Sequence, residues 1–354
     1  MQNQDLRELL RERVLKAAAD GTPLLIQGSG SKSFYGRSTT GEMVDLAGHT
    51  GIVAYESTEL VLTARAGTPL AAVESALMEK SQMLAFEPPH FGPHATLGGM
   101  VACGLSGPRR PYAGSVRDSV LGVKIINGNG EILSFGGQVM KNVAGFDVSR
   151  LMVGALGTLG ILLDVSLKVL PKPETEETLC FDMTAEDALA AMNRWSGLNW
   201  PLSAACHDGE RVYIRLSGAE AAIKASAKKL GGERLAEANQ FWASLREQTL
   251  PFFQDDLPLW RLSLPPATPQ LTLLGPSFMD WGGALRWVKT DVPAETLFAE
   301  AHKAGGHATV FRSADRIGEV FQPLAEPLKA LHIQLKKAFD PKGIFNPGRL
   351  YQEW

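Results

Sequence analysis

The fold prediction starts from LLIQGSGSKSFYG, residues 24–36. Its first three residues predict a short buried strand, and the glycine- and serine-rich segment GSGSKS follows at 28–33. Glycine permits positive φ and has no Cβ, so several backbone N–H groups of such a loop can point at one anion. The serine hydroxyls and Lys32 add donors and positive charge. The loop therefore predicts a phosphate or pyrophosphate site, although a plain flexible turn has a similar composition.

Two common phosphate-binding motifs do not fit this loop. The dinucleotide fingerprint needs a third glycine at the start of a helix, whereas Ser33 stands at that position and no helical periodicity follows. The P-loop needs an ending of Gly-Lys followed by Ser or Thr, which is absent here. A nicotinamide-dependent dehydrogenase and a Walker-type nucleotide site are therefore disfavoured.

Length, charge and cysteine content limit the function classes. The 354 residues are enough for two domains, and a net charge of -3 gives no electrostatic case for nucleic acid or an anionic membrane. Cys103, Cys180 and Cys206 lack CxxC spacing, which argues against a disulfide framework, a zinc site or an iron–sulfur cluster in this chain. There is no signal-peptide pattern and no apolar run of bilayer length, so we expect a cytoplasmic protein without a transmembrane segment.

Strands and helices alternate along the rest of the chain, which predicts an α+β fold. A helix is expected over 5–20, and Thr96 is expected to cap a helix whose start at 97–99 offers free N–H donors. The turn NGNG at 127–130 indicates a hairpin. A linker rich in proline and glutamate follows residue 170, and the pattern beyond it is typical of an antiparallel α+β domain.

Four motifs in this order resemble one group of flavoproteins. They are QGSGSKS at 27–33, ATLGG at 95–99 with SGPRRPYAGSVRDSVLG at 106–122, KNVAGFDVSRLMVGALGTLGI at 141–161, and DPKGIFNPGRL at 340–350. Through them the chain resembles flavoproteins of the vanillyl-alcohol oxidase and p-cresol methylhydroxylase (VAO/PCMH) type. Within that group it most resembles the FAD-binding subunits of bacterial glycolate oxidases. Residues 175–335 contribute little to the resemblance.

The resemblance implies an architecture and a cofactor. A two-part FAD-binding domain of the PCMH/VAO type would span 1–172, a smaller antiparallel, ferredoxin-like α+β cap domain 173–335, and a tail at 336–354 would return to the FAD domain. The residues implied to contact FAD are Gly28, Ser29, Gly30, Ser31, Lys32, Ser33, Pro89, Thr96, Leu97, Gly98, Gly99, Ser106, Gly107, Gly114, Ser115, Val116, Asp118, Gly157, Gly160, Ile161 and Asn346. Members with a tethered flavin often place a histidine where Ser31 stands, so we expect non-covalent FAD. We expect no metal site.

The resemblance also implies a function. The chain would be the FAD-binding subunit of a heteromeric glycolate oxidase or dehydrogenase, in which glycolate or a similar 2-hydroxy acid such as D-lactate is oxidised to the 2-oxo acid. Arg312, Arg286 and Arg110 are candidates to bind the substrate carboxylate, and no catalytic base is assigned. Electrons would leave through a second FAD-containing, catalytic-type subunit and an iron–sulfur subunit, and attachment to the inner face of the membrane would come only through these partners.

An alternative remains open from the same residues. The catalytic-type subunit of the resembled enzymes carries a histidine cluster in its substrate domain, whereas this chain offers only HATVFR around His307 there. The chain would then be a non-catalytic FAD-carrying or assembly subunit, and its partner would perform the oxidation.

Overall fold

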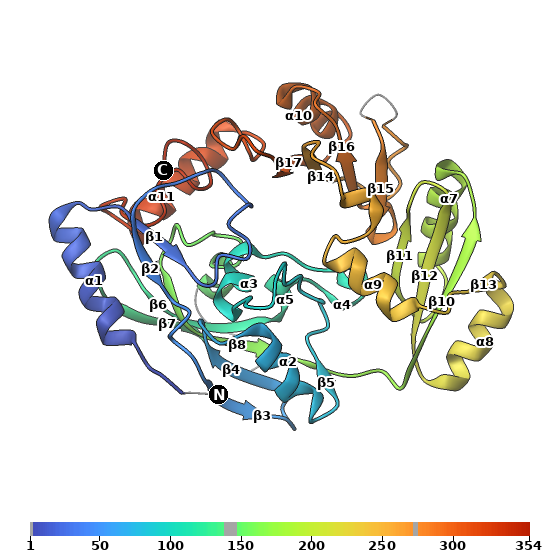
Figure 1. The fold of residues 1–354 in the computed structure, drawn as a ribbon, viewed down its shortest axis with the longest axis horizontal. Coiled ribbons are helices and arrows are strands. Elements are labelled where there is room, and N and C mark those ends of the chain that lie inside the picture. Colours follow the sequence, from blue (N-terminus) through green and yellow to red (C-terminus); the bar gives the residue numbers. More distant parts are fainter. Residues whose placement is uncertain (1–2, 138–146, 272–274) are drawn as a thin grey trace.

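The computed structural model describes residues 3–137, 147–271 and 275–354, and its elements form the predicted α+β fold. Within these ranges the strands form a five-stranded sheet, an eight-stranded sheet and two further pairs of strands. Figure 1 shows the five-stranded sheet in one half of the molecule and the eight-stranded sheet in the other. No helix in the described part of the chain is long and apolar enough to cross a membrane.

The first helix and strand place the glycine-rich loop. α1 (Arg7–Asp20) lies within the range 5–20 predicted to be helical, and it buries Leu10, Val14 and Ala17, which share one helical face. Gly21 ends α1 in the left-handed conformation with a φ of 68°. β1 (Leu24–Gln27) then pairs in parallel with β2 (Glu42–Asp45). The loop therefore leaves the carboxyl end of β1.

The five-stranded sheet carries the core of the first half. Its strands are antiparallel and run across the sheet as β3 (Ile52–Glu56), β4 (Val61–Arg65), β8 (Ile161–Lys168), β6 (Val120–Ile126) and β7 (Ile132–Gly136). The central strand β8 is buried along nearly its whole length. The predicted hairpin at 127–130 joins β6 to β7. The helices and short strands of this half are α2 (Leu70–Met78), α3 (Leu97–Cys103), α4 (Arg110–Ala113), α5 (Val116–Ser119), α6 (Val148–Leu151) and the pair β5 (Gln82–Met83) with β9 (Leu170–Pro171).

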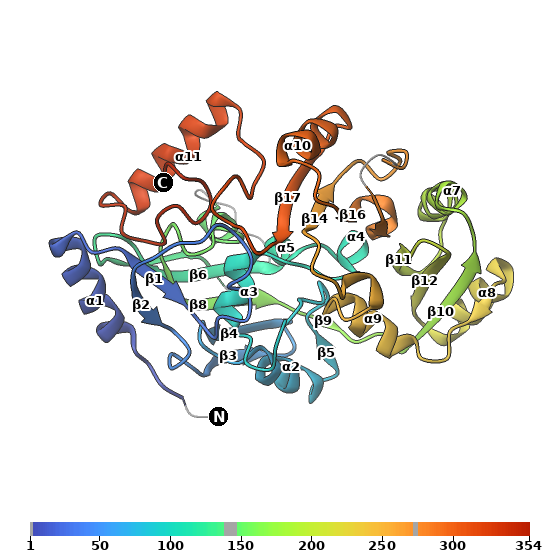
Figure 2. The ribbon, with the colours of Figure 1, turned by 45° about the horizontal axis from the view of Figure 1, so that its top comes forward.

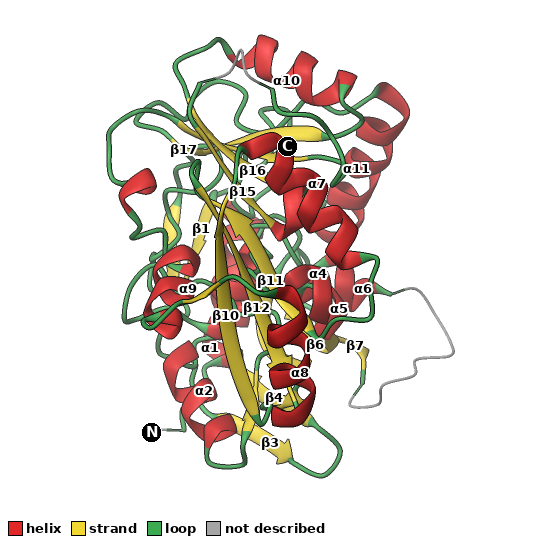
Figure 3. Cartoon of the chain, turned by 90° about the vertical axis from the view of Figure 1, so that its right-hand side faces the viewer, coloured by secondary structure: helices red, strands yellow, loops and turns green. Residues whose placement is uncertain are grey.

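The eight-stranded sheet forms the second half and is antiparallel throughout, as predicted. Its strands run across the sheet as β13 (Glu233–Arg234), β10 (Thr175–Asp182), β12 (Arg211–Gly218), β11 (Leu202–His207), β15 (Ser277–Asp280), β16 (Leu285–Lys289), β14 (Leu259–Ser263) and β17 (His307–Arg312). Its helices are α7 (Ala185–Ser196), α8 (Glu220–Leu230), α9 (Ala238–Arg246), α10 (Ala294–Lys303) and the 3-10 turns η1 (Pro251–Phe253) and η3 (Trp281–Gly283). Figure 3 shows α7 and α8 on one side of β10–β12 and α9 on the other.

Alternation along these strands gives the sheet an outer face and an inner face. On β16, Val288 packs outward with α10, whereas Trp287 belongs to the inner core. That inner core also contains Tyr35 and Leu156, which come from the first half. The inner face of the eight-stranded sheet is therefore packed against the first half.

The end of the chain also lies against the first half. Figures 1 and 2 both show α11 (Glu326–Phe339) over the first half, on the side of β1. The N–H of Leu24 donates to the carbonyl of Ile344 at 2.7 Å, and the N–H of Asn346 donates to the carbonyl of Leu24 at 3.0 Å. These two bonds place the tail next to the glycine-rich loop.

Candidate functional site

The glycine-rich loop, the start of α3 and the tail line one groove. Its empty volume is about 810 Å³ with the part open to solvent included. The predicted FAD contacts that line it are Gly28, Ser29, Gly30, Ser31, Lys32, Ser33, Thr96, Gly98, Gly99, Gly157, Gly160 and Asn346. Segments far apart in the sequence therefore meet at one concave surface.

The loop 28–33 presents backbone donors to this groove. The N–H groups of Gly28, Ser29 and Lys32 have no hydrogen-bond partner among the described residues. A Cβ on Gly28 would lie 2.4 Å from Oγ1 of Thr96, so only glycine lets the loop approach α3 this closely. Gly30 has a φ of 75°, which turns the chain back at a conformation that glycine adopts without strain. Such a cluster of free N–H groups suits an anion.

Lys32 adds a positive charge under the loop. Its side chain is buried, and its ammonium donates to the carbonyl of His90 at 3.0 Å and to Oγ of Ser31 at 3.4 Å. Among the residues that the structure describes, no carboxylate forms an ion pair with it. Burial lowers the pKa of Lys32, because the charged form loses hydration. An anion in the groove would supply the missing partner, and a phosphate group has that chemistry.

The start of α3 differs from the prediction. Thr96 caps the helix as expected, because its Oγ1 accepts the N–H of Gly99 at 3.2 Å. The N–H of Leu97, however, donates to the carbonyl of Thr68, and the N–H of Gly98 donates to the carbonyl of Ala66. The expectation of free donors at this helix start is therefore wrong, because the segment after β4 supplies their acceptors. Residues 96, 98 and 99 shape the groove wall without offering these N–H groups.

The tail closes the groove through Asn346. Its Oδ1 accepts the N–H of Ile26 at 2.7 Å, and its Nδ2 donates to the carbonyl of Leu156 at 2.7 Å. A Cβ on Gly157 would lie 2.6 Å from that Nδ2, so glycine is required there as well. Asn346 has a φ of 39°, a left-handed value that asparagine tolerates better than most residues. One side chain thus ties β1, the segment before β8 and the tail together.

The remaining predicted FAD contacts lie away from the groove surface. Leu97 and Ile161 are fully buried in the cores next to the groove. Pro89, Ser106 and Gly107 line a second cavity, whereas Gly114, Ser115, Val116 and Asp118 line neither. Asp118 caps α5 by accepting the N–H of Ser115 at 2.8 Å. A role for these residues in cofactor binding stays a prediction.

Sequence reasoning missed Arg349, which also lines the groove. Its guanidinium donates to the carbonyl of Ser33 at 3.0 Å and to the carbonyl of Arg37 at 2.9 Å. Burial lowers the pKa of this guanidinium. Arg349 lies in the fourth motif, three residues after Asn346, and that position was the available signal. Arg349 therefore holds the carboxyl-terminal end of the glycine-rich loop, at Ser33.

The arginines proposed for the substrate carboxylate lie outside both cavities. Arg286 donates to the carbonyls of Gly283 and Thr268, and Arg312 donates to Oε1 of Gln248 at 3.0 Å. The guanidinium of Arg110 stacks on Trp281, 4.4 Å from the ring centroid. Two other arginines, Arg261 and Arg246, line the second cavity instead, and Arg246 is paired with Glu247 at 2.8 Å. Within the described ranges, no three His, Cys, Asp or Glu side chains are grouped so as to hold a metal ion.

Comparison with known proteins identifies relatives over almost the whole chain. The FAD binding domain family matches residues 6–136. The glycolate oxidase subunit GlcE of Escherichia coli (strain K12) is 51% identical over 349 residues, which cover 99% of this chain and 98% of that protein. The glycolate oxidase subunit GlcD of Bacillus subtilis (strain 168) is 35% identical over 159 residues, covering 44% of this chain and 34% of the relative.

A D-lactate dehydrogenase and a solved synthase extend the comparison. The D-lactate dehydrogenase of Anaerostipes hadrus is 31% identical over 153 residues, covering 43% of this chain and 32% of that protein. A solved structure of alkyldihydroxyacetonephosphate synthase superposes with a TM-score of 0.66 at 16% identity, covering 97% of this chain and 76% of the other. At that identity the structural likeness supports the fold alone.

Proposed function

This chain belongs to the family of the glycolate oxidase subunit GlcE, flavoproteins with a PCMH/VAO-type FAD-binding domain, and on that premise we propose that it is the FAD-binding subunit of a heteromeric 2-hydroxy-acid oxidoreductase. The substrate would be glycolate or a similar 2-hydroxy acid such as D-lactate, and the product the 2-oxo acid. The observation that carries the proposal is the 51% identity to GlcE over 99% of the chain, combined with a groove built by the matching motifs.

The groove suits the diphosphate of FAD. The free N–H groups of Gly28, Ser29 and Lys32 are assigned to the pyrophosphate. The Lys32 ammonium, which has no carboxylate partner among the described residues, would add a positive charge. Asn346 and Gly157 line the groove, and Arg349 donates hydrogen bonds to the loop. Bound FAD supplies the acceptor for the hydride that leaves the α-carbon. Since Ser31 stands where a tethering histidine would be, the proposed binding is non-covalent.

The proposal extends to domains and partners. The FAD-binding domain is assigned to 1–172, the cap domain to 173–335 and the returning tail to 336–354. The names of the relatives as subunits support a complex, and the proposed partners are a second FAD-containing catalytic-type subunit and an iron–sulfur subunit. The proposed location is the cytoplasm, with membrane attachment only through partners.

A second candidate function is a carrier or assembly subunit without oxidation of its own. Its support is that GlcD and the D-lactate dehydrogenase match less than half of this chain, so the likeness to these relatives does not extend over the whole fold. In that case the partner would hold the complete substrate site.

One experiment separates the two candidates. The purified yellow chain is mixed anaerobically with glycolate or D-lactate, and the flavin absorbance near 450 nm is followed. Bleaching supports the oxidoreductase. A flavin that stays oxidised here, together with full turnover by the partner subunits alone, favours the carrier. Acid precipitation then tests the attachment, because yellow colour in the pellet would contradict non-covalent binding.

A further inference from the structure

The second cavity lies where the two halves meet. It is enclosed by residues 105–108 of the first half, by the end of α9 and by the inner face of the eight-stranded sheet. Its empty volume, with the part open to solvent included, is about 360 Å³, against about 810 Å³ for the groove. The second cavity therefore suits a smaller molecule than the groove does.

Strand alternation sets the chemistry of the cavity. Arg261 on β14 and Trp287 on β16 are direct partners in the antiparallel ladder, so their side chains share a face. Phe311 on β17 and Asp280 on β15 also line the cavity. The same wall therefore combines two aromatic rings with one cation and one carboxyl group.

Arg261 is half-buried and lacks the partners that the buried arginines Arg215 and Arg286 of this sheet have. Arg215 pairs with Glu87 at 2.8 Å, and Arg286 donates to two backbone carbonyls. The Arg261 side chain has no hydrogen bond or ion pair within the described part of the chain, and its guanidinium lies over the Trp281 ring, 5.2 Å from the centroid. Burial lowers the pKa of Arg261. A guanidinium that is partly withdrawn from water and has no carboxylate partner is destabilised, and an anionic ligand would supply that partner.

Asp280 presents the complementary group. Its side chain is buried, Oδ1 accepts the N–H of Trp281 at 2.7 Å, and the second oxygen has no hydrogen-bond partner among the described residues. Burial raises the pKa of Asp280 to about 7, Glu87 adds to the rise, and the Trp281 N–H, Arg215 and Arg261 oppose it. Tyr112 and Cys206 are the other titratable groups near it. The free oxygen can accept a hydrogen bond from a hydroxyl group.

From these contacts we propose that Arg261 and Asp280 form a binding site for a short 2-hydroxy carboxylate. Arg261 binds the carboxylate, Asp280 accepts the hydrogen bond of the 2-hydroxyl group, and Trp287 and Phe311 limit the length of the apolar remainder. The inference rests on the proposed function, because it locates the substrate of that function. It also replaces Arg312, Arg286 and Arg110 as the carboxylate-binding residue.

The test uses two acids that the flavin cannot oxidise. 2-Hydroxyisobutyrate has no hydrogen on its α-carbon, and isobutyrate differs from it by the hydroxyl group alone. Isothermal titration calorimetry on the FAD-loaded chain measures both affinities. We expect the wild-type chain to prefer the hydroxy acid. Arg261→Gln should weaken both acids by about 10- to 100-fold, because a charge-assisted hydrogen bond is lost. Asp280→Asn should remove the preference and leave isobutyrate binding equal or tighter.

Two further variants keep the result interpretable. Arg286→Gln removes a buried arginine from the same sheet but outside the cavity, so its affinities should match the wild type. Arg261→Lys keeps the positive charge, so its affinity for both acids should lie between those of the wild type and Arg261→Gln. It replaces Arg261→Gln in the test if that variant does not fold. Flavin content and melting temperature verify folding.

The outcomes separate this inference from the proposed function. Wild-type chain that binds neither acid, or Arg261 variants that bind both as tightly as wild type, would overturn the site. If the calorimetric pattern holds but neither glycolate nor D-lactate reduces the flavin, the site stands and the proposed function fails. If the flavin is reduced while the variants bind normally, the function stands and this site is wrong.

Discussion

Replacement of Glu87 by alanine would remove one of the carboxylates that join the two halves of the molecule. The Glu87 side chain accepts the backbone N–H of Arg109 at 3.0 Å and pairs with the Arg215 guanidinium at 2.8 Å. Arg109 belongs to the first half, and Arg215 lies on β12 of the eight-stranded sheet. Glu176 on β10 completes the cluster by pairing with Arg109. Glu87→Ala would leave two cations, with side chains 7% and 6% exposed, to share one carboxylate.

The size of the effect follows from these contacts. Removing one partner of a buried ion pair costs about 3–5 kcal/mol, because the remaining charge is neither hydrated nor paired. Glu176 stays in place and the Glu87 side chain is 18% exposed, so we expect the lower end, about 3 kcal/mol. Backbone strain does not contribute to the change in the free energy of unfolding, because the φ of 46° at residue 87 strains alanine as it strains glutamate.

The decrease in the free energy of unfolding is measured by urea unfolding, monitored through the fluorescence of the seven tryptophans. Glu220→Ala is the matched control, because Glu220 forms an exposed ion pair with Lys224 one turn away on α8. That pair is worth about 0.3–0.5 kcal/mol. If the two variants lower the midpoint equally, the cluster does not hold the halves together and the reasoning is refuted.

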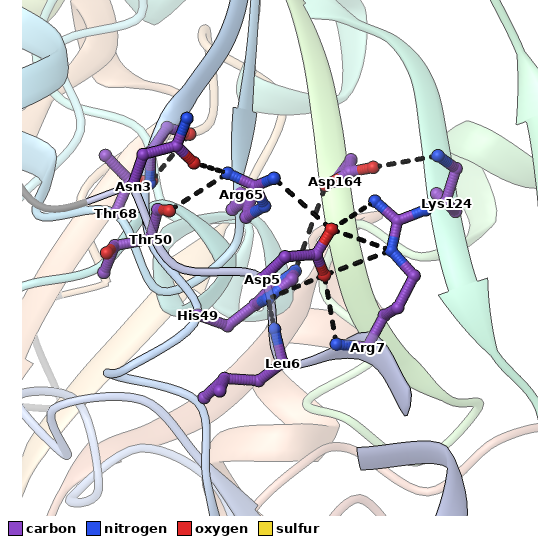
Figure 4. A network of polar contacts seen from close by, with 11 residues as sticks. Asn3, Asp5, Leu6, Arg7, His49, Thr50, Arg65, Thr68, Lys124 and Asp164 are labelled. Carbon is purple, nitrogen blue, oxygen red and sulfur yellow. Dashed lines mark hydrogen bonds and ion pairs between the residues drawn. The ribbon is translucent and has the colours of Figure 1, made fainter. Parts of the chain in front are cut away.

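Three more predictions concern the groove and a buried histidine. Gly28→Ala should weaken FAD binding by about tenfold or more, measured as flavin per chain, because its Cβ would lie 2.4 Å from Thr96; Gly318→Ala, with open space around it, should not. Asn346→Ala should cost about 1–3 kcal/mol in urea unfolding, because a backbone N–H and a carbonyl lose their partner, and an unchanged midpoint would contradict this. Burial lowers the pKa of His49, and this effect is larger than the rise caused by the negative charges of Asp164 and Asp5 nearby (Figure 4). The unfolded chain therefore binds the proton first, and stability should fall as pH drops below about 6.5; a His49→Gln chain with the same pH profile would count against it.

Residues that line the groove could be predicted because each segment carries a short motif of its own, although the segments lie far apart in the sequence. Close backbone approach requires glycine, and Gly28, Gly98 and Gly157 each sit where a Cβ would meet another segment within 2.8 Å. Such positions can be recognised in the sequence because they are occupied by glycine. The prediction of free donors at the start of α3 was wrong, because these N–H groups donate to the carbonyls of residues 66 and 68 on another segment. No pattern within 95–103 carries that information.

The arginine proposed to bind the substrate could not be predicted from the sequence either, because the alternation of side chains along each strand decides which arginine faces the cavity. Arg286 and Arg261 both lie on strands of the same sheet, yet they point to opposite faces because Arg261 pairs with Trp287 and Leu262 pairs with Arg286. A shift of one residue in one of the two strands would place both guanidiniums on the same face. The sequence around each arginine is equally apolar, so neither composition nor motif tells them apart. Only the register decides which of the two guanidiniums faces the first half, and that register is set by pairing partners some 25 residues away.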